Sequence, residues 1–231
     1  MTSFAIKLLA CCALLLALPV GASAKIIELG QIDEPLTPSC PTTKTAKCLV
    51  VSRTTGYQVK VGDTEDMFVV PRKGKIVAWT VTLGAASTKD VAFFDKNLGG
   101  EPSAGITVFQ PAKHLYGTIV SQSPVSKLTD YLGETVQFPL KTALDVVKGQ
   151  RVALTVPTWA PALAYGLDSD VSWRASRSKD QCDQPSVQSS VTGVGKQTRF
   201  LCLYKTARLT YTVTMISEPH GPKKTATKKK K

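Results

Sequence analysis

The chain has 231 residues, of which 43% are hydrophobic and 20% are charged, and it contains 16 Gly and 14 Pro. This composition suits one medium domain or two small ones, and it excludes a collagen-like, coiled-coil or wholly disordered chain. The formal net charge is +12 and the chain has only 2 His, so a histidine-rich metal site is not expected. Composition therefore narrows the class of fold and leaves the function open.

Residues 1–24 are predicted to be a secretory signal peptide. Lys7 precedes a short apolar run, and residues 22–24 (Ala-Ser-Ala) have the small-x-small pattern that signal peptidase accepts. This run is too short to cross a hydrocarbon layer of about 30 Å, and no later segment is apolar enough to do so. A lipoprotein cleaved before Cys11 is the alternative, but almost no hydrophobic region would then follow Lys7. We expect secretion, with no transmembrane segment.

Four cysteines remain after residue 24. An oxidising compartment favours disulfides, and no Cys-x-x-Cys pair is present to suggest a zinc site. Four cysteines allow three pairings, between which the sequence cannot choose. Closing a shorter loop costs less entropy, which favours Cys40–Cys48 and Cys182–Cys202.

From Cys48 onward, apolar side chains alternate with polar or small ones, which is typical of strands with one buried and one wetter face. Frequent Val and Thr support strands over helices. Clear alternation covers residues 57–61, 77–83, 152–156 and 209–215, and further strands are expected near 67–70, 105–110, 115–122, 134–138, 171–176 and 199–204.

One helix is predicted near residues 88–98. Ser87 is a suitable N-cap with Asp90 three residues later, and Gly99-Gly100 can end the helix. The stripe expected to be buried consists of Val91, Phe94 and Leu98.

About ten short strands and one helix predict an all-β fold, a two-sheet antiparallel sandwich for which we expect the jelly-roll arrangement. The predicted organisation is a signal peptide (1–24), an irregular lead-in (25–47), a β-sandwich domain (48–217) and a disordered Lys-rich tail (218–231).

Five motifs lie within the predicted sandwich: residues 54–57 (TTGY), 68–71 (FVVP), 74–79 (GKIVAW), 152–157 (VALTVP) and 173–177 (WRASR). On these motifs the sequence resembles a group of secreted actinobacterial β-sandwich proteins of unknown function. The resemblance covers about residues 48–217, and its motifs are structural, so it implies fold and compartment and carries no catalytic residues.

A hydrolase would need a catalytic constellation, for which the sequence offers little. A Ser-His-Asp triad needs a histidine in the domain, and His114 is the sole candidate because His220 lies in the tail. There is no Gly-x-Ser-x-Gly motif. We therefore interpret His114 as a surface or half-buried histidine.

Two groups of acidic residues could supply paired carboxylates for a glycosidase or oxygen ligands for calcium. Asp is also common in solvated turns, which is the interpretation we favour. No metal, cofactor or catalytic residue is therefore predicted. The two groups are Asp168 with Asp170, and Asp63 with Glu65 and Asp66.

Three aromatic residues are candidates for ligand binding. Trp159 stands between Pro157 and Pro161, which exclude a regular central strand, and a rigid loop holding an indole could stack on a sugar ring or another apolar ligand. Tyr165 and Trp173 follow nearby. The alternative, which we favour, is that Trp159 folds back and covers one end of the sandwich.

The C-terminal tail carries a concentrated positive charge. It could retain the protein on an anionic cell-envelope polymer or glycan through salt-sensitive attraction, or it could simply be a solvated terminus. Lysines without aromatic side chains give no chemistry for recognising bases, so no specific nucleic acid partner is expected. The lysines are Lys223, Lys224, Lys228, Lys229, Lys230 and Lys231.

Together these features predict a secreted, non-enzymatic β-sandwich module that binds a ligand or has a structural role at the cell envelope. The alternative is an extracellular hydrolase that acts on a polysaccharide, which would need convergent carboxylates or a site centred on His114.

Overall fold

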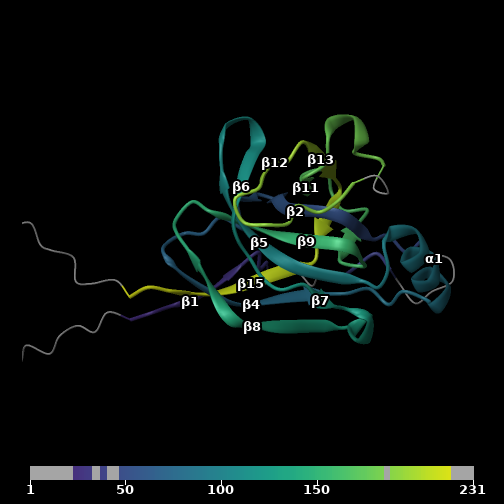
Figure 1. Cartoon of the computed structure of the whole chain (residues 1–231), viewed down its shortest axis with the longest axis horizontal. Coiled ribbons are helices and arrows are strands. Elements are labelled where there is room, and N and C mark those ends of the chain that lie inside the picture. Colours follow the sequence, from purple (N-terminus) through teal and green to yellow (C-terminus); the bar gives the residue numbers. More distant parts are fainter. Residues whose placement is uncertain (1–22, 33–36, 41–46, 185–187, 220–231) are drawn as a thin grey trace, which may run out of the picture.

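The structure, a computed structural model of the chain, describes residues 23–32, 37–40, 47–184 and 188–219. It is mostly β, with one α-helix, α1 (Thr88–Leu98) (Figure 1). The strands are β1 (Ile26–Leu29), β2 (Val51–Val61), β3 (Thr64–Glu65), β4 (Gly74–Thr82), β5 (Ser103–Pro111), β6 (Tyr116–Gln122), β7 (Ser126–Lys127), β8 (Thr135–Val146), β9 (Arg151–Ala160), β10 (Leu163–Tyr165), β11 (Ser172–Ala175), β12 (Gln197–Arg199), β13 (Cys202–Lys205), β14 (Ala207–Leu209) and β15 (Tyr211–Ser217).

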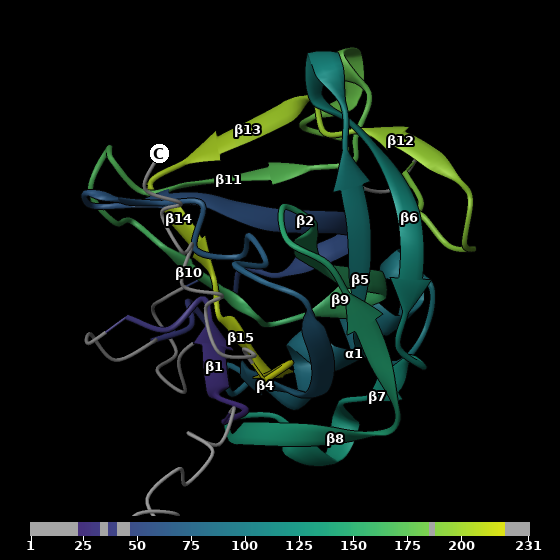
Figure 2. The ribbon, with the colours of Figure 1, turned by 90° about the vertical axis from the view of Figure 1, so that its left-hand side faces the viewer.

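The strands form antiparallel sheets. A four-stranded sheet has the order β1-β15-β4-β8, and a larger sheet has the order β12-β6-β5-β9-β2-β11-β13, with β3 beside β2 and β7 beside β5. Strands β10 and β14 form a separate pair. The larger sheet curls strongly into a half-barrel, which is clearest in Figure 2. The antiparallel, mostly β prediction is confirmed, whereas this strand order does not show the jelly roll that we expected.

Alternating sequence located most of the strands, and the exceptions have local causes. Residues 67–70 form only an isolated bridge, Val69 to Arg151, because left-handed Asp66 (φ 54°) and Pro71 bound the segment. Residues 199–204 are divided between β12 and β13, which pair with different strands. The lead-in is not wholly irregular, since β1 pairs with β15.

The predicted helix and its caps are confirmed. Ser87 Oγ accepts a hydrogen bond from the Asp90 backbone N–H (3.2 Å), and Gly99 ends the helix in the left-handed conformation (φ 100°). Leu98 is buried, while Val91 and Phe94 are half-buried. The helix lies at the end of the molecule opposite to the start of β1 and the end of β15 (Figure 1).

The main core fills the space between the two sheets, and a second apolar cluster lies on the other face of the curled sheet. The expectation of one wetter face is therefore wrong for β9, where Ala153 and Thr155 are buried. The Thr155 hydroxyl is bonded to those of Thr55 (3.1 Å) and Thr107 (2.5 Å), so its burial leaves no polar atom unpaired. The second cluster consists of Tyr57, Phe109, Ile119, Ala153 and Phe200.

The described ends of the chain lie together. Ser217 donates its backbone N–H to the carbonyl of Lys25 (2.8 Å), beside the β1–β15 ladder. The predicted signal peptide before residue 23 and the lysines of the predicted tail lie outside the described residues. Among the residues that the structure describes, no helix is long and apolar enough to cross a membrane.

The buried phenol of Tyr211 gives a testable dependence of stability on pH. Its hydroxyl donates to the carbonyl of Val152 (3.0 Å) and its ring stacks on Phe68 at 4.2 Å. Burial raises the pKa of Tyr211 well above its ordinary value, because the phenolate would lose its hydration. Burial also raises the pKa of Tyr57.

We expect the free energy of unfolding to fall as the pH rises above about 10, because the unfolded chain then releases phenolic protons that the native state retains. Tyr211→Phe should reduce this slope, at a cost of about 1 kcal/mol near neutral pH for the lost hydrogen bond. Urea unfolding between about pH 8 and pH 11 measures both effects. If the free energy of unfolding of the variant falls as steeply with alkaline pH as that of the unchanged protein, Tyr211 is not the source of the pH dependence. Some pH dependence should remain in the variant because of Tyr57.

Candidate functional site

A cavity of about 640 Å³ lies against one edge of the curled sheet. Its walls come from β10, β11, β13 and β14, which lie along the left side of Figure 2, and from the segment that leads into β2. The described residues that line it are mostly apolar, aromatic or cationic. They are Lys47, Leu49, Val50, Val51, Leu163, Tyr165, Trp173, Arg177, Leu203, Tyr204, Lys205 and Ala207.

Two stacked aromatic rings line this cavity. The β11–β13 register places Trp173 opposite Tyr204, and the ring centroids lie 4.5 Å apart with an interplanar angle of 23°. On β2, Gly56 leaves room for the indole, since a Cβ there would lie 2.7 Å from a Trp173 ring carbon. A glycine inside a strand thus marks the close approach that seats Trp173.

Arg177 is a buried cation beside this aromatic pair. Its Nη2 donates to the carbonyl of Ser52 (2.5 Å) and its Nη1 donates to the hydroxyl of Tyr204 (2.8 Å), which in turn donates to the carbonyl of Cys182. The guanidinium carbon lies 5.7 Å from the centroid of the Tyr204 ring. No carboxylate pairs with this cation among the described residues, although buried charges in proteins are usually paired.

Two buried donors in the wall lack an acceptor. The Nε1 of Trp173 and the Nε of Arg177 have no hydrogen-bond partner among the described residues. The side chains are only 4% and 6% exposed, respectively. Buried polar groups without partners are rare in folded proteins, and both of these belong to residues that line the same cavity.

Both disulfides adjoin the cavity walls. The pairs are Cys40–Cys48 and Cys182–Cys202, which confirms the pairing favoured by loop length. Cys48 directly precedes wall residue Leu49, and Cys202 directly precedes Leu203. A disulfide restricts the chain around it, so both walls have a covalent anchor.

The structure brings two of the three predicted aromatic residues together. Trp173 lines the cavity, and Tyr165 contributes a ring that is 57% exposed. The Tyr165 backbone N–H is bonded to the Ser39 hydroxyl (2.7 Å), which ties the lead-in to this edge of the sheet.

Trp159 lies elsewhere and is fully buried. Its Nε1–H donates to a carboxylate oxygen of Asp95 in α1 (2.9 Å) and its ring packs on Phe94 at 4.9 Å. The predicted loop is wrong, because β9 continues through Pro157 to Ala160. A β-bulge between Ser52 and Thr54 of β2 interrupts the ladder opposite this segment, where Pro157 has no N–H to donate. An indole with no exposed face cannot serve as a stacking platform.

The sequence analysis missed Arg177 and Tyr204. A signal for Arg177 was present, because Trp173, Ala175 and Arg177 are spaced by two and all three are buried. Tyr204 had no comparable signal, since its role depends on the register between β11 and β13.

The residues considered for catalysis do not share one pocket: Asp168 and Asp170 line a hollow of about 350 Å³ beside the β2–β3 turn, and His114 is not among its described lining residues. His114 is exposed in a tight turn at η1 (Lys113–Leu115), where no described side chain bonds to its imidazole. Asp168 and Asp170 are exposed between β10 and β11.

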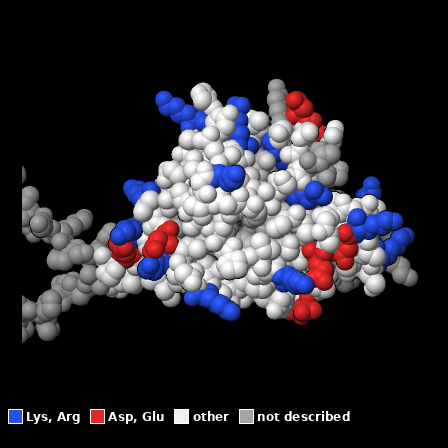
Figure 3. Space-filling model, viewed as in Figure 1, with Lys and Arg blue, Asp and Glu red and all other residues white. Residues whose placement is uncertain are grey.

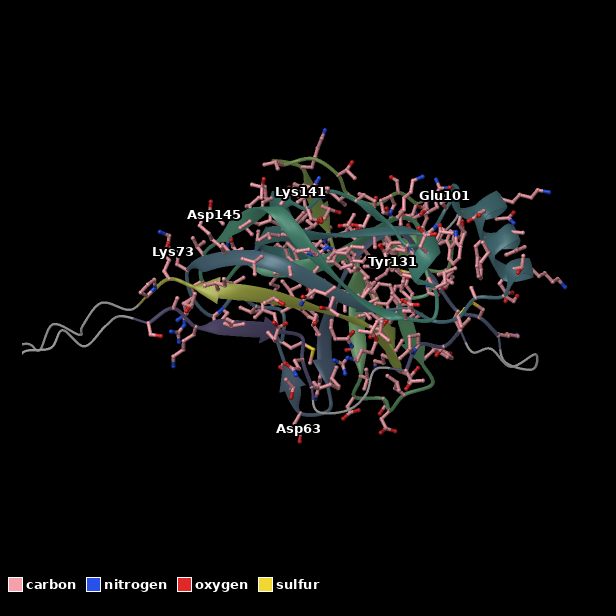
Figure 4. All side chains as sticks on the ribbon, turned by 90° about the horizontal axis from the view of Figure 1, so that it is seen from below. Asp63, Lys73, Glu101, Tyr131, Lys141 and Asp145 are labelled. Carbon is pink, nitrogen blue, oxygen red and sulfur yellow. A yellow bond between two sulfur atoms is a disulfide. The ribbon has the colours of Figure 1, made fainter. Side chains whose placement is uncertain are left out.

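The acidic residues near the β2–β3 turn are engaged in surface contacts or face outward. Glu65 Oε1 lies 3.8 Å from Lys60 Nζ, and Asp66 Oδ1 lies 2.6 Å from Arg151 Nη2. Asp63 points outward (Figure 4). Within the described ranges, no three potential metal ligands of the His, Cys, Asp and Glu types gather into a group.

A second hollow, of about 360 Å³, lies beside the four-stranded sheet and is lined mainly by hydroxyl and amide side chains. These groups bond to one another: Thr82 to Thr135 (3.0 Å), and Gln137 to Thr80 (3.4 Å). Most of its polar groups have partners, and none of its described lining residues has a buried polar atom without one, so this hollow is a weaker candidate than the aromatic cavity.

The face in Figure 3 gives no further indication of a polyanion site, because its Lys and Arg side chains are scattered and several of them lie beside Asp or Glu. The six tail lysines lie outside the described residues, so their role in retention stays a prediction.

Comparisons with protein families, with curated proteins and with solved structures found no match for this chain. The resemblance to secreted actinobacterial proteins likewise stays a prediction.

Trp159 is expected to stabilise the fold. Trp159→Phe removes the N–H bonded to Asp95 and leaves a small void beneath α1, so it should lower the free energy of unfolding by about 2 kcal/mol. Phe93→Ala is the control, because Phe93 is 61% exposed on the same helix and should change stability by about 0.5 kcal/mol or less. Urea unfolding measures both, and equal effects would contradict this role.

Proposed function

We propose that this chain is an exported, non-enzymatic β-sandwich module that binds a small ligand with an apolar or aromatic body in the cavity at Trp173. The observation that carries the proposal is the stacked Trp173–Tyr204 pair, which lines a cavity of about 640 Å³ and includes a buried indole N–H without a partner. Small-molecule sites commonly have volumes of about 300–1,000 Å³, mostly apolar walls and a few polar groups that orient the ligand.

The rigidity of the walls supports a preformed site. The disulfides Cys40–Cys48 and Cys182–Cys202 hold the two segments beside the cavity, and Gly56 admits the indole of Trp173. A ligand that enters such a site orders few side chains, so little of its binding energy is lost to conformational entropy.

Export is supported by two features. Disulfides persist in oxidising compartments. Cleavage after Ala24 would remove the predicted signal peptide immediately before β1, leaving the β1–β15 ladder intact.

Binding is preferred over hydrolysis because of the chemistry of the walls. General acid–base catalysis of glycoside cleavage needs a pair of carboxyl groups, and acyl transfer needs a nucleophile with an adjacent base. The described residues that line the cavity supply aromatic rings, aliphatic groups and cations, and none of them is Asp, Glu, His, Cys or Ser.

The test is titration with N-phenylnaphthylamine, an uncharged aromatic probe whose fluorescence rises in apolar surroundings. We expect saturable binding, and Tyr165→Ala should weaken it roughly two- to tenfold through loss of one ring contact. Because Tyr165 is 57% exposed, the variant should fold normally.

Tyr116→Ala is the matched control. Tyr116 is also an exposed tyrosine, but it lies at the start of β6, away from the cavity-lining residues, and its removal should leave the affinity unchanged. Absence of saturable binding, or equal affinity losses in the two variants, would overturn the proposed function.

A further inference from the structure

The charged residues that line the cavity are all cationic. Lys47, Arg177 and Lys205 line it, and none of the described lining residues is acidic. The five ion pairs among the described residues all involve other side chains. Both lysines are exposed, whereas Arg177 is buried.

Arg177 keeps its charge uncompensated while being held firmly. A guanidinium has five N–H donors, and three of the hydrogen bonds of Arg177 go to the carbonyls of Ser52 and Cys182 and the hydroxyl of Tyr204. Carbonyl and hydroxyl oxygens satisfy donors but do not neutralise a cation. In the low dielectric beneath the surface, such a charge acts over a longer distance than it would in water.

We propose that the ligand of this cavity is an anionic amphiphile, in which a carboxylate or phosphate group is attached to an apolar or aromatic body. The body packs against Trp173 and Tyr204, and the anionic group lies in the positive field of Arg177 between the lysines of the wall. This inference rests on the proposed function, since it specifies the ligand class of the same site.

An uncharged or cationic ligand fits the same cavity less well. An uncharged ligand would leave the charge of Arg177 uncompensated, and a cation would add like-charge repulsion in a site with three positive side chains. A carboxylate or phosphate gains charge-assisted hydrogen bonds, which are shorter and stronger than neutral ones.

The experiment compares four probes that share a naphthalene ring: naphthoate, naphthyl phosphate, naphthamide and naphthylmethylammonium. Isothermal titration calorimetry with the exported protein should give an affinity for at least one of the two anions about tenfold above that for the amide, with the ammonium probe the weakest. The preference should shrink between about 0.05 M and 0.5 M salt. The two anionic probes distinguish a carboxylate from a phosphate as the natural group.

Substitutions locate the charge effect without disturbing the core. Lys47→Gln combined with Lys205→Gln should weaken binding of the anion several-fold more than binding of the amide, so the preference for the anion shrinks. Lys141→Gln combined with Lys148→Gln is the matched control, because it removes the same charge from exposed lysines outside the cavity. The buried Arg177 is left in place, since its replacement could unfold the protein.

The outcomes separate the two proposals. If the amide or the ammonium probe binds as tightly as the anions, or if both double variants act alike, the anionic-ligand inference is overturned while the proposed function stands. If N-phenylnaphthylamine shows no saturable binding, the proposed function falls and the inference falls with it. If N-phenylnaphthylamine binds but neither anion binds more tightly than the amide, only the inference falls. The expected result is a preference for an anion that shrinks when the cavity lysines are replaced and is unchanged when the control lysines are replaced.

Discussion

Strand β2 is buried on both faces for most of its length, and the rest of the structure depends on how its buried polar side chains find hydrogen-bond partners. One face of its sheet packs in the main core, and the other carries Tyr57 in the second cluster. Its polar side chains therefore need partners inside the protein. The buried Gln58 side chain donates to the carbonyls of Ser172 and Ala207 and accepts from the Leu209 N–H, which ties β2 to β11 and β14.

The same strand shapes the cavity. Ser52, beside the bulge, supplies the carbonyl that holds Arg177, and Gly56 leaves the space that the Trp173 indole fills. The contacts that stabilise the curled sheet and those that position the candidate site thus share one strand. Substitutions in β2 should therefore be judged by stability and binding together, because neither measurement alone distinguishes the two roles.

Local sequence was sufficient for features that depend on neighbouring residues. Alternation located β2, β4 and β9, and the Ser87 cap with Gly99 located α1. The sequence analysis favoured a Trp159 that packs back on the fold, but its contact with α1 and the contact between Trp173 and Tyr204 could not be predicted in this way, since each joins segments brought together by the fold. The prolines near Trp159 were misleading because a bulge on the neighbouring strand accommodates a missing donor, and that bulge is a property of the pair.

Arg177 belongs to both the fold and the candidate site, because neutral groups hold its guanidinium in place without cancelling its positive charge. A carboxylate placed against it would have formed a buried ion pair and cancelled the positive field in the cavity. Carbonyl oxygens and the Tyr204 ring instead hold the guanidinium in position while its net charge remains. Desolvating that charge costs stability, and only a group of opposite charge entering from outside can offset the cost without changing the protein. The cavity is therefore the place where ligand binding and stability should be most strongly coupled.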